Sequence, residues 1–283
     1  MKRPPLPAEA PWDLPTRWAV LALLALPLAL FYPALLGGKM LWGADIQSLE
    51  LVFKTAVQRG LVRGEWPLWM PEILCGMPGI AASNLVFLHP LELLLCLLRT
   101  PPWMGFGLDA AAEVALSGLG LWLLLRQLGL SRAASLLGAL AFAASGTQIS
   151  LLYAGHINNL KGIAMIPWVF WGALWGWQGR RWLGWGLCGA ALALQVLGLG
   201  LQIFAYTIIG LVGFVAWMAW VGSGDPSRER GEGDSVMPGP GKPTLFTPLS
   251  LDASNPWWAG FLGLCVAALF LVLLAAPQLF PSL

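Results

Sequence analysis

Long apolar runs recur along this chain, and they constrain its fold more than any motif does. A helix needs about 20 mostly apolar residues to cross the roughly 30 Å hydrocarbon core of a bilayer. Hydrophobic residues make up 58% of the chain and charged residues only 11%, whereas a soluble domain has about 25% charged residues. The sequence therefore predicts an all-α fold, a polytopic transmembrane helical bundle of about seven spanning helices. The candidate spans are residues 17–36, 106–125, 133–153, 162–177, 183–199, 202–221 and 257–276.

A long loop, residues 37–105, separates the first two candidate spans and contains many of the charged residues. Residues 46–59 predict an amphipathic helix with Glu50 and Lys54 on its polar face. A short helix of this kind lies in the membrane surface. Residues 84–98 would extend only about 22 Å as a helix, which is too short to cross. We therefore expect one long external loop that carries two membrane-surface helices.

The positions of Lys and Arg predict the orientation of the bundle. If residues 84–98 do not cross, the connections that contain Arg126, Arg132 and Arg180 share one side with the amino terminus. The positive-inside rule then places the amino terminus in the cytoplasm and residue 45 outside. Residues 222–256 are rich in Gly, Pro and Ser, which predicts a disordered cytoplasmic linker. We treat residues 1–283 as a single transmembrane domain and expect its carboxy-terminal part to be missing.

Candidate functional side chains gather on the expected external face. Asp45 begins the amphipathic helix at the membrane edge, where it can be a helix N-cap, a role that does not exclude catalysis, or a general base at the lipid–water boundary. Asp109 and Glu113 lie four residues apart near the external end of a span, where ionisable groups either face a polar cavity or snorkel to the interface. His156 and Lys161 belong to a polar, partly cationic turn that is either a phosphate-binding loop or a plain connection.

Several function classes lack their sequence signatures. The chain contains no HExxH, no GxSxG and no Walker loop, and its two His residues are too few for most His-based metal sites. A net charge of +2 without a dense basic cluster does not indicate a nucleic-acid partner. The four Cys residues lie far apart without metal or disulfide spacing, so we interpret them as ordinary apolar residues.

Four segments carry a resemblance to a known family. They read WGADIQ at 42–47, GEWPLWMPEILCGMPGIAASNLVFLHPLELL at 64–94, YAGHINNLKGIAMIPWVFW at 153–171 and AAPQLFPSL at 275–283. With these segments the chain resembles the amino-terminal half of the YfhO-type bacterial membrane proteins. Those proteins belong to the GT-C superfamily of polyprenyl-phosphate-dependent glycosyltransferases. Met70 and His89 depart from the pattern of that family, which has Asn and Tyr there.

The resemblance implies a fold, an activity and a location. Such enzymes have a seven-helix module with a long first external loop that carries two membrane-surface helices. An acidic residue early in that loop acts as the catalytic base, and the matching residue here is Asp45. The donor would be a polyprenyl-phosphate sugar and the acceptor an extracytoplasmic cell-envelope polymer. The protein would be a multi-pass protein of the bacterial inner (cytoplasmic) membrane, in contact with membrane lipid.

A phosphate leaving group needs positive charge nearby rather than a proton. The side chains expected at the substrate are His156, Lys161, Lys54, Arg59, Arg63, Glu65 and Trp69. A divalent metal such as Mg or Mn is left open, and Asp109 and Glu113 are its expected ligands.

A second function class remains open from the residues themselves. In a transporter or flippase of a lipid-linked substrate, the same acidic and basic groups would line a translocation path. Transporters often consist of two related halves with broken helices at corresponding places. The sequence contains no evident internal repeat, which favours the glycosyltransferase.

Overall fold

The computed structural model describes residues 14–71, 73, 75–79, 87–179, 181–223 and 256–279. The expected linker at 222–256 and the first residues of the 84–98 segment therefore fall largely outside the described part. The helices are α1 (Thr16–Leu35), the π-helix η1 (Ile46–Glu50), α2 (Leu51–Val62), α3 (Pro90–Leu97), α4 (Pro102–Gln127), α5 (Arg132–Ala143), α6 (Gly146–Ala154), α7 (Ile157–Trp177), α8 (Arg181–Leu197), α9 (Leu201–Ser223) and α10 (Pro256–Leu279).

The fold is a helical bundle, as the apolar runs predict. Within the described residues, five helical segments are long and apolar enough to cross a membrane, namely Thr16–Leu35, Pro102–Gln127, Arg132–Ala154, Leu201–Val221 and Trp257–Ala275. The expected spans at 162–177 and 183–199 are also helical, as α7 and α8. The apolar part of α8, Trp182–Leu197, is shorter than the other five. A membrane-embedded helical bundle is thus confirmed, while the count of seven crossings stays a prediction.

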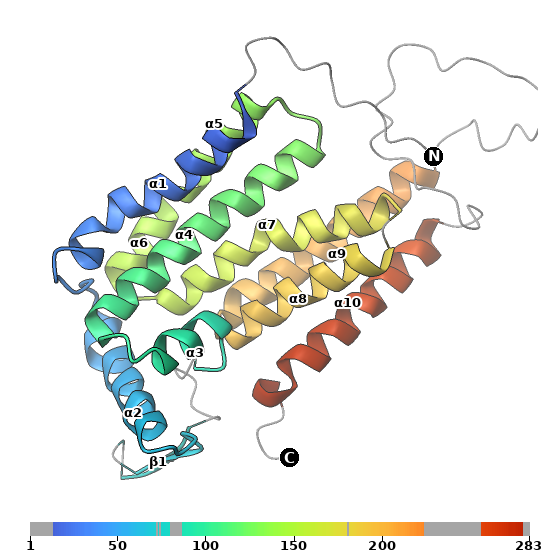
Figure 1. The fold of residues 1–283 in the computed structure, drawn as a ribbon. Coiled ribbons are helices and arrows are strands. Elements are labelled where there is room, and N and C mark those ends of the chain that lie inside the picture. The colour runs from blue at the N-terminus through green and yellow to red at the C-terminus, as the bar shows by residue number, and fades with distance from the viewer. Residues whose placement is uncertain are drawn as a thin grey trace, which may run out of the picture.

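Long helices that follow one another in the chain cross the bundle in opposite directions (Figure 1). Helix α1 packs on α4, α4 on α7, α7 on α8, and α8 on α10, with α5 beside α4 and α9 beside α7. The loop elements α2 and α3 both lie at the end of the bundle where α1 finishes and α4 begins. The connection between α4 and α5, residues 128–131, lies at the opposite end of the bundle, as does the turn between α7 and α8. This alternation matches the sequence-based arrangement in which the 84–98 segment does not cross.

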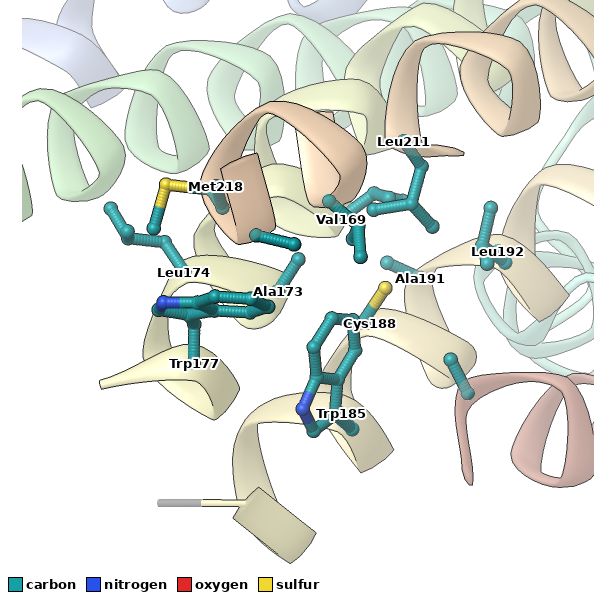
Figure 2. Close-up of a cluster of buried hydrophobic side chains, with 13 residues drawn as sticks. Val169, Ala173, Leu174, Trp177, Trp185, Cys188, Ala191, Leu192, Leu211 and Met218 are labelled. Atoms are coloured by element: carbon teal, nitrogen blue, oxygen red, sulfur yellow. The ribbon is translucent and has the colours of Figure 1, made fainter. Parts of the chain in front are cut away.

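The largest hydrophobic core lies among α7, α8, α9 and α10. Figure 2 shows Trp185 beside Cys188 and Trp177 beside Ala173, with Leu211 and Met218 from α9 above them. Small residues bring α7 and α8 close together, as is common for packed helices in membranes. A Cβ atom on Gly184, for example, would lie 2.1 Å from the backbone nitrogen of Gly176. Close packing of this kind holds the carboxy-terminal part of α7 against the beginning of α8.

The expected span at 133–153 is interrupted. Helix α5 ends at Ala143 and α6 begins at Gly146. The amide of Gln148 donates to the backbone oxygen of Phe142 (2.9 Å), a carbonyl of the last turn of α5, and to the hydroxyl of Ser117 on α4 (3.3 Å). A buried carbonyl at a helix end needs such a partner. The interruption is therefore stabilised by a polar side chain that the hydropathy pattern does not reveal.

The loop between α1 and α4 contains a short hairpin that the sequence did not indicate. Strands β1 (Trp69–Met70) and β2 (Met77–Pro78) pair antiparallel, with Met70 opposite Met77. Cys75 has a φ of 62° and Gly76 a φ of 112° just before β2. The predicted all-α fold is therefore wrong for these four residues. Helix α3 has eight residues, about 12 Å of rise, so it cannot cross a bilayer.

We predict that both ends of the 37–105 loop lie on the same side of the membrane. In a background without the four native Cys residues, Glu65→Cys and Arg99→Cys are expected to react with an impermeant thiol reagent from one side, and Leu130→Cys from the other. Glu65 and Arg99 are exposed at the end that carries α2, and Leu130 follows α4. Labelling of positions 99 and 130 from the same side would contradict this arrangement.

Candidate functional site

Seven buried side chains with acidic, basic or imidazole groups meet where the loop packs on the bundle. They are Glu50, Lys54, His89, Glu92, Asp109, Glu113 and Lys161, and they are all the buried Asp, Glu, Lys, Arg and His residues of the described part. We call this group the charged cluster. Its members come from η1, α2, the residue before α3, α3, α4 and α7. Buried charges are expensive unless they are paired, so their pairing determines how these elements fit together.

Two ion pairs form the centre of the charged cluster. The Lys161 ammonium on α7 contacts the Asp109 carboxylate on α4, and both side chains are almost completely buried. Lys54 lies 2.7 Å from Glu92, which joins α2 to α3. The same ammonium lies 4.7 Å from the centre of the Phe106 ring, within reach of a cation–π interaction. Lys54 thus connects the loop helices α2 and α3 to each other and, through Phe106, to α4 of the bundle.

The acidic residue Glu113 faces His89 at the inner side of the cluster. Nε2 of His89 lies 3.9 Å from Oε1 of Glu113, which is too long for a hydrogen bond. Burial, with a smaller effect of the Lys161 charge, lowers the pKa of His89 to about 3, so the imidazole is neutral at pH 7. Within the described residues neither side chain has a hydrogen-bond partner.

The free space at this junction is small. A cavity of about 10 Å³ is lined by Glu50, Phe53, Lys54, Val57, Phe87, Glu92, Cys96, Phe106, Asp109 and Ile157. That volume corresponds to about one water molecule. The loop therefore packs tightly over the helix ends in this conformation, and a sugar or a phosphate group would enter the cluster only if the loop moved.

Asp45 lies at the edge of the cluster and remains accessible to water. Its Oδ2 atom is 3.0 Å from Nε2 of His156, and the two side chains are 43% and 46% exposed, respectively. The side chain of Asp45 makes no cap hydrogen bond to η1. The N-cap interpretation is therefore wrong, and Asp45 and His156 form a separate pair. Of the predicted site residues, these two are brought together at the surface.

A backbone contact between two glycines places Asp45 beside His156. Gly155 adopts a φ of +93°, and a Cβ atom there would lie 2.9 Å from the backbone nitrogen of Asp45. On the other side, a Cβ on Gly43 would lie 2.6 Å from Cα of Gly155. About one turn of η1 after Asp45, Oε1 of Glu50 accepts a hydrogen bond from Nδ2 of Asn158 (3.1 Å). Two side-chain pairs thus join η1 to the beginning of α7.

The structure changes the expected role of Lys161. The sequence suggested a polar loop at 153–161 that would hold a phosphate, but residues 157–177 are helical and Lys161 is buried against Asp109. Its ammonium is therefore already neutralised by Asp109. Asp109 does not snorkel to the interface either, because its carboxylate points to α7 rather than to water.

The polar face of the first loop helix turns inward. Glu50 and Lys54 were expected to face water as a pair four residues apart, but both are buried, and Lys54 pairs with Glu92 instead. Glu92, Glu50 and Asn158 were missed as site residues. The spacing of Glu50 and Lys54 was visible in the sequence, whereas the direction in which they point depends on tertiary packing.

The remaining predicted substrate residues lie away from the charged cluster. Arg59, Arg63, Glu65 and Trp69 are exposed on the second half of α2 and on the hairpin. Along the helix axis, Arg59 is about 20 Å from Asp45, because each helical residue adds about 1.5 Å. A phosphate held by Arg59 or Arg63 would not be within bonding distance of a group that reacts at Asp45.

Comparisons with protein-family models, with curated proteins and with solved structures give no match to this chain. Within the described residues, no group of three or more His, Cys, Asp or Glu side chains is placed to hold a metal ion. The site is therefore interpreted from its own geometry.

We predict that Gly155→Ala separates Asp45 from His156 and destabilises the protein by about 1–3 kcal/mol, because the added methyl group overlaps the backbone of η1 and the positive φ is unfavourable for Ala. Gly146→Ala is the matched control, since a Cβ there has no neighbour within 4 Å. The unfolding temperatures of both variants are measured by thermal unfolding in detergent. Equal unfolding temperatures for the two would contradict the close contact.

Glu50 makes the stability of the protein depend on pH. Burial raises the pKa of Glu50 from 4.5 to about 7, so the folded protein keeps a proton that the unfolded chain loses. Stability therefore falls as the pH rises from about 4.5 to about 7, by up to about 3 kcal/mol at 1.4 kcal/mol per pKa unit. Glu50→Gln keeps an acceptor for Asn158 and is expected to flatten this dependence in thermal unfolding. The exposed Glu65→Gln variant should follow the parent, and a parental pH profile in Glu50→Gln would contradict the prediction.

Proposed function

We propose that this protein is a membrane glycosyltransferase that moves a sugar from a polyprenyl-phosphate donor to an extracytoplasmic cell-envelope acceptor, with Asp45 as the general base. The observation that carries the proposal is the Asp45–His156 pair, which is nearly half exposed and lies about one turn of η1 from Glu50 of the buried charged cluster. A base at this position meets a hydroxyl group from water and a lipid-borne donor from the membrane. The resemblance to the YfhO-type proteins in the same segment supports the same assignment.

The proposed membrane arrangement has seven spans and a cytoplasmic amino terminus in a bacterial inner membrane. The distribution of Arg residues between the two ends of the bundle supports this orientation. The loop helices would lie in the outer membrane surface. In support of this, Leu49 and Val52 are exposed on the side of η1 and α2 that faces away from the bundle, while Glu50 and Lys54 are buried. A surface helix with apolar residues outward is suited to the lipid interface.

The proposed reaction is a single displacement at the anomeric carbon. The acceptor oxygen forms a bond to that carbon while the bond from the carbon to the phosphate oxygen breaks. Polyprenyl phosphate leaves with the bonding electron pair, and Asp45 takes the proton of the acceptor hydroxyl. Because attack and departure occur on opposite faces, the anomeric configuration is inverted. The phosphate needs no proton to leave, so a base is the main requirement.

Positive charge for the departing phosphate would come from the neighbourhood of the pair. Asp45 and Glu50 are separated by about one turn of η1, and Lys161 and Lys54 lie in the charged cluster beyond Glu50. Both lysines are paired with carboxylates here. A donor phosphate would therefore compete with Asp109 and Glu92 for them, which requires the loop to shift on substrate binding.

The second candidate, a transporter or flippase of a lipid-linked substrate, is favoured by one observation. Glu113 is fully buried in α4, faces neutral His89 and has no hydrogen-bond partner among the described residues. Unpartnered carboxyl groups at this depth are typical of translocation pathways. In that case Glu113→Gln would abolish transport, whereas Asp45→Asn would leave it intact.

The decisive variant is Asp45→Asn, which keeps the size of the side chain and removes the base. General-base catalysis contributes about 10²–10⁴-fold, so sugar transfer from a polyprenyl-phosphate donor should fall by that factor. Glu65→Gln is the control, because it removes an exposed carboxylate of the same loop. Turnover of purified protein in lipid nanodiscs is the measurement. Parental turnover in Asp45→Asn would show that Asp45 is not the base, and transport without transfer would favour the second candidate.

A further inference from the structure

We infer that His156 is a positioning residue, which holds the Asp45 carboxylate so that one oxygen faces the acceptor hydroxyl. This inference rests on the proposed function, because it assigns a role beside the base. It also replaces the role that the sequence suggested for His156, which was to bind the donor phosphate.

The geometry of the pair separates the two oxygens of Asp45. Nε2 of His156 lies 3.0 Å from Oδ2 of Asp45, a distance at which an Nε2–H can donate to that oxygen, and Oδ1 would then be left for the acceptor. Both side chains are nearly half exposed, so an incoming hydroxyl group can reach the carboxylate without displacing the imidazole. A base held by a single hydrogen bond loses rotational freedom around χ1 and χ2, and that orientation raises the rate.

The backbones of the two residues are held independently of their side chains. Gly155 packs its Cα against the backbone of Gly43 and lies against that of Asp45. Ile46 and Ile157, the next residue after each partner, are both buried in one hydrophobic core together with Phe106. The Asn158–Glu50 hydrogen bond adds a second connection one turn away. Packed neighbours of this kind keep the distance and orientation of two functional side chains within the narrow range that catalysis requires.

The same geometry argues against a phosphate-binding role. Nε2 of His156 is directed at a carboxylate, and the other cation of the expected phosphate loop, Lys161, is paired with Asp109. A phosphate at His156 would therefore meet the negative charge of Asp45. The two roles make different kinetic predictions, because a residue that acts through the base changes kcat, whereas one that binds the donor changes KM.

Two substitutions at His156 separate these roles. His156→Gln can place an amide N–H near the former position of Nε2, whereas His156→Leu has similar size and no donor. We expect His156→Leu to lower kcat by about 10- to 100-fold with an unchanged KM for the polyprenyl-phosphate donor, as for a misplaced catalytic group. His156→Gln should restore most of kcat. Equal losses in both variants, or a raised KM with a parental kcat, would overturn the inference.

The activity of Asp45→Asn distinguishes a failure of this inference from a failure of the proposed function. If Asp45→Asn is inactive while His156→Leu is fully active, only the positioning role is wrong. If Asp45→Asn is fully active, the proposed function itself fails.

A spectroscopic measurement tests the pair without any turnover. The chain has two His residues, so protein labelled with ¹⁵N-His gives two sets of imidazole signals. Asp45→Asn should shift the set that belongs to exposed His156 and leave that of buried His89 in place, with His156→Gln providing the assignment. Unchanged signals for His156 would show that the pair does not form in the membrane, and would overturn the inference.

Discussion

The contact between Lys161 and Asp109 is the interaction on which the arrangement of this end of the bundle depends. Both groups are almost completely buried, and the removal of one partner from such a pair typically costs about 3–5 kcal/mol because the other charge is left unpaired. The pair fixes α7 against α4 at the level where the loop docks. Lys54 and Glu92 extend the same network into α2 and α3. The interface of the loop with the bundle thus adds this polar network to the apolar contacts of Ile46 with Phe106 and Ile157, whereas α7, α8, α9 and α10 meet in a hydrophobic core.

This interface explains why Glu50 and Lys54 are buried while apolar residues beside them on the loop are exposed. The loop exposes the apolar side chains of Leu49, Val52 and Trp66. The charged side chains of Glu50 and Lys54, on the same part of the loop as Leu49 and Val52, are buried. In water such a surface would be unfavourable, since exposed apolar patches favour association. At a lipid interface the same surface is stabilised and the buried charges pair with each other. This distribution of side chains supports the proposal that the loop helices lie in the membrane surface.

Much of the fold could be predicted from hydropathy, because the membrane requires long apolar helices and leaves few other solutions. The sequence also indicated that Asp45, Asp109, Glu113, His156 and Lys161 share one end of the bundle. It could not indicate their partners. The Asp109–Lys161 contact joins residues 52 positions apart, and the break before Gly146 depends on Gln148 reaching Phe142. Such contacts depend on helix rotation and register, which hydropathy leaves undetermined.

The way in which η1 packs against the start of α7 links the exposed Asp45–His156 pair to the buried charged cluster. Asp45 pairs with His156, and Glu50, five residues later, pairs with Asn158, which is only two residues after His156, so η1 and the start of α7 match in two places. The π-helical geometry of η1 is compatible with this match, since π-turns often occur at functional sites where a side chain must be redirected. A shift of η1 by one residue would move Asp45 away from His156 and Glu50 away from Asn158 together. The position of the accessible carboxylate is therefore set by the same contacts that close the loop over the charged cluster, so any motion that admits a substrate to the cluster must also change the surroundings of Asp45.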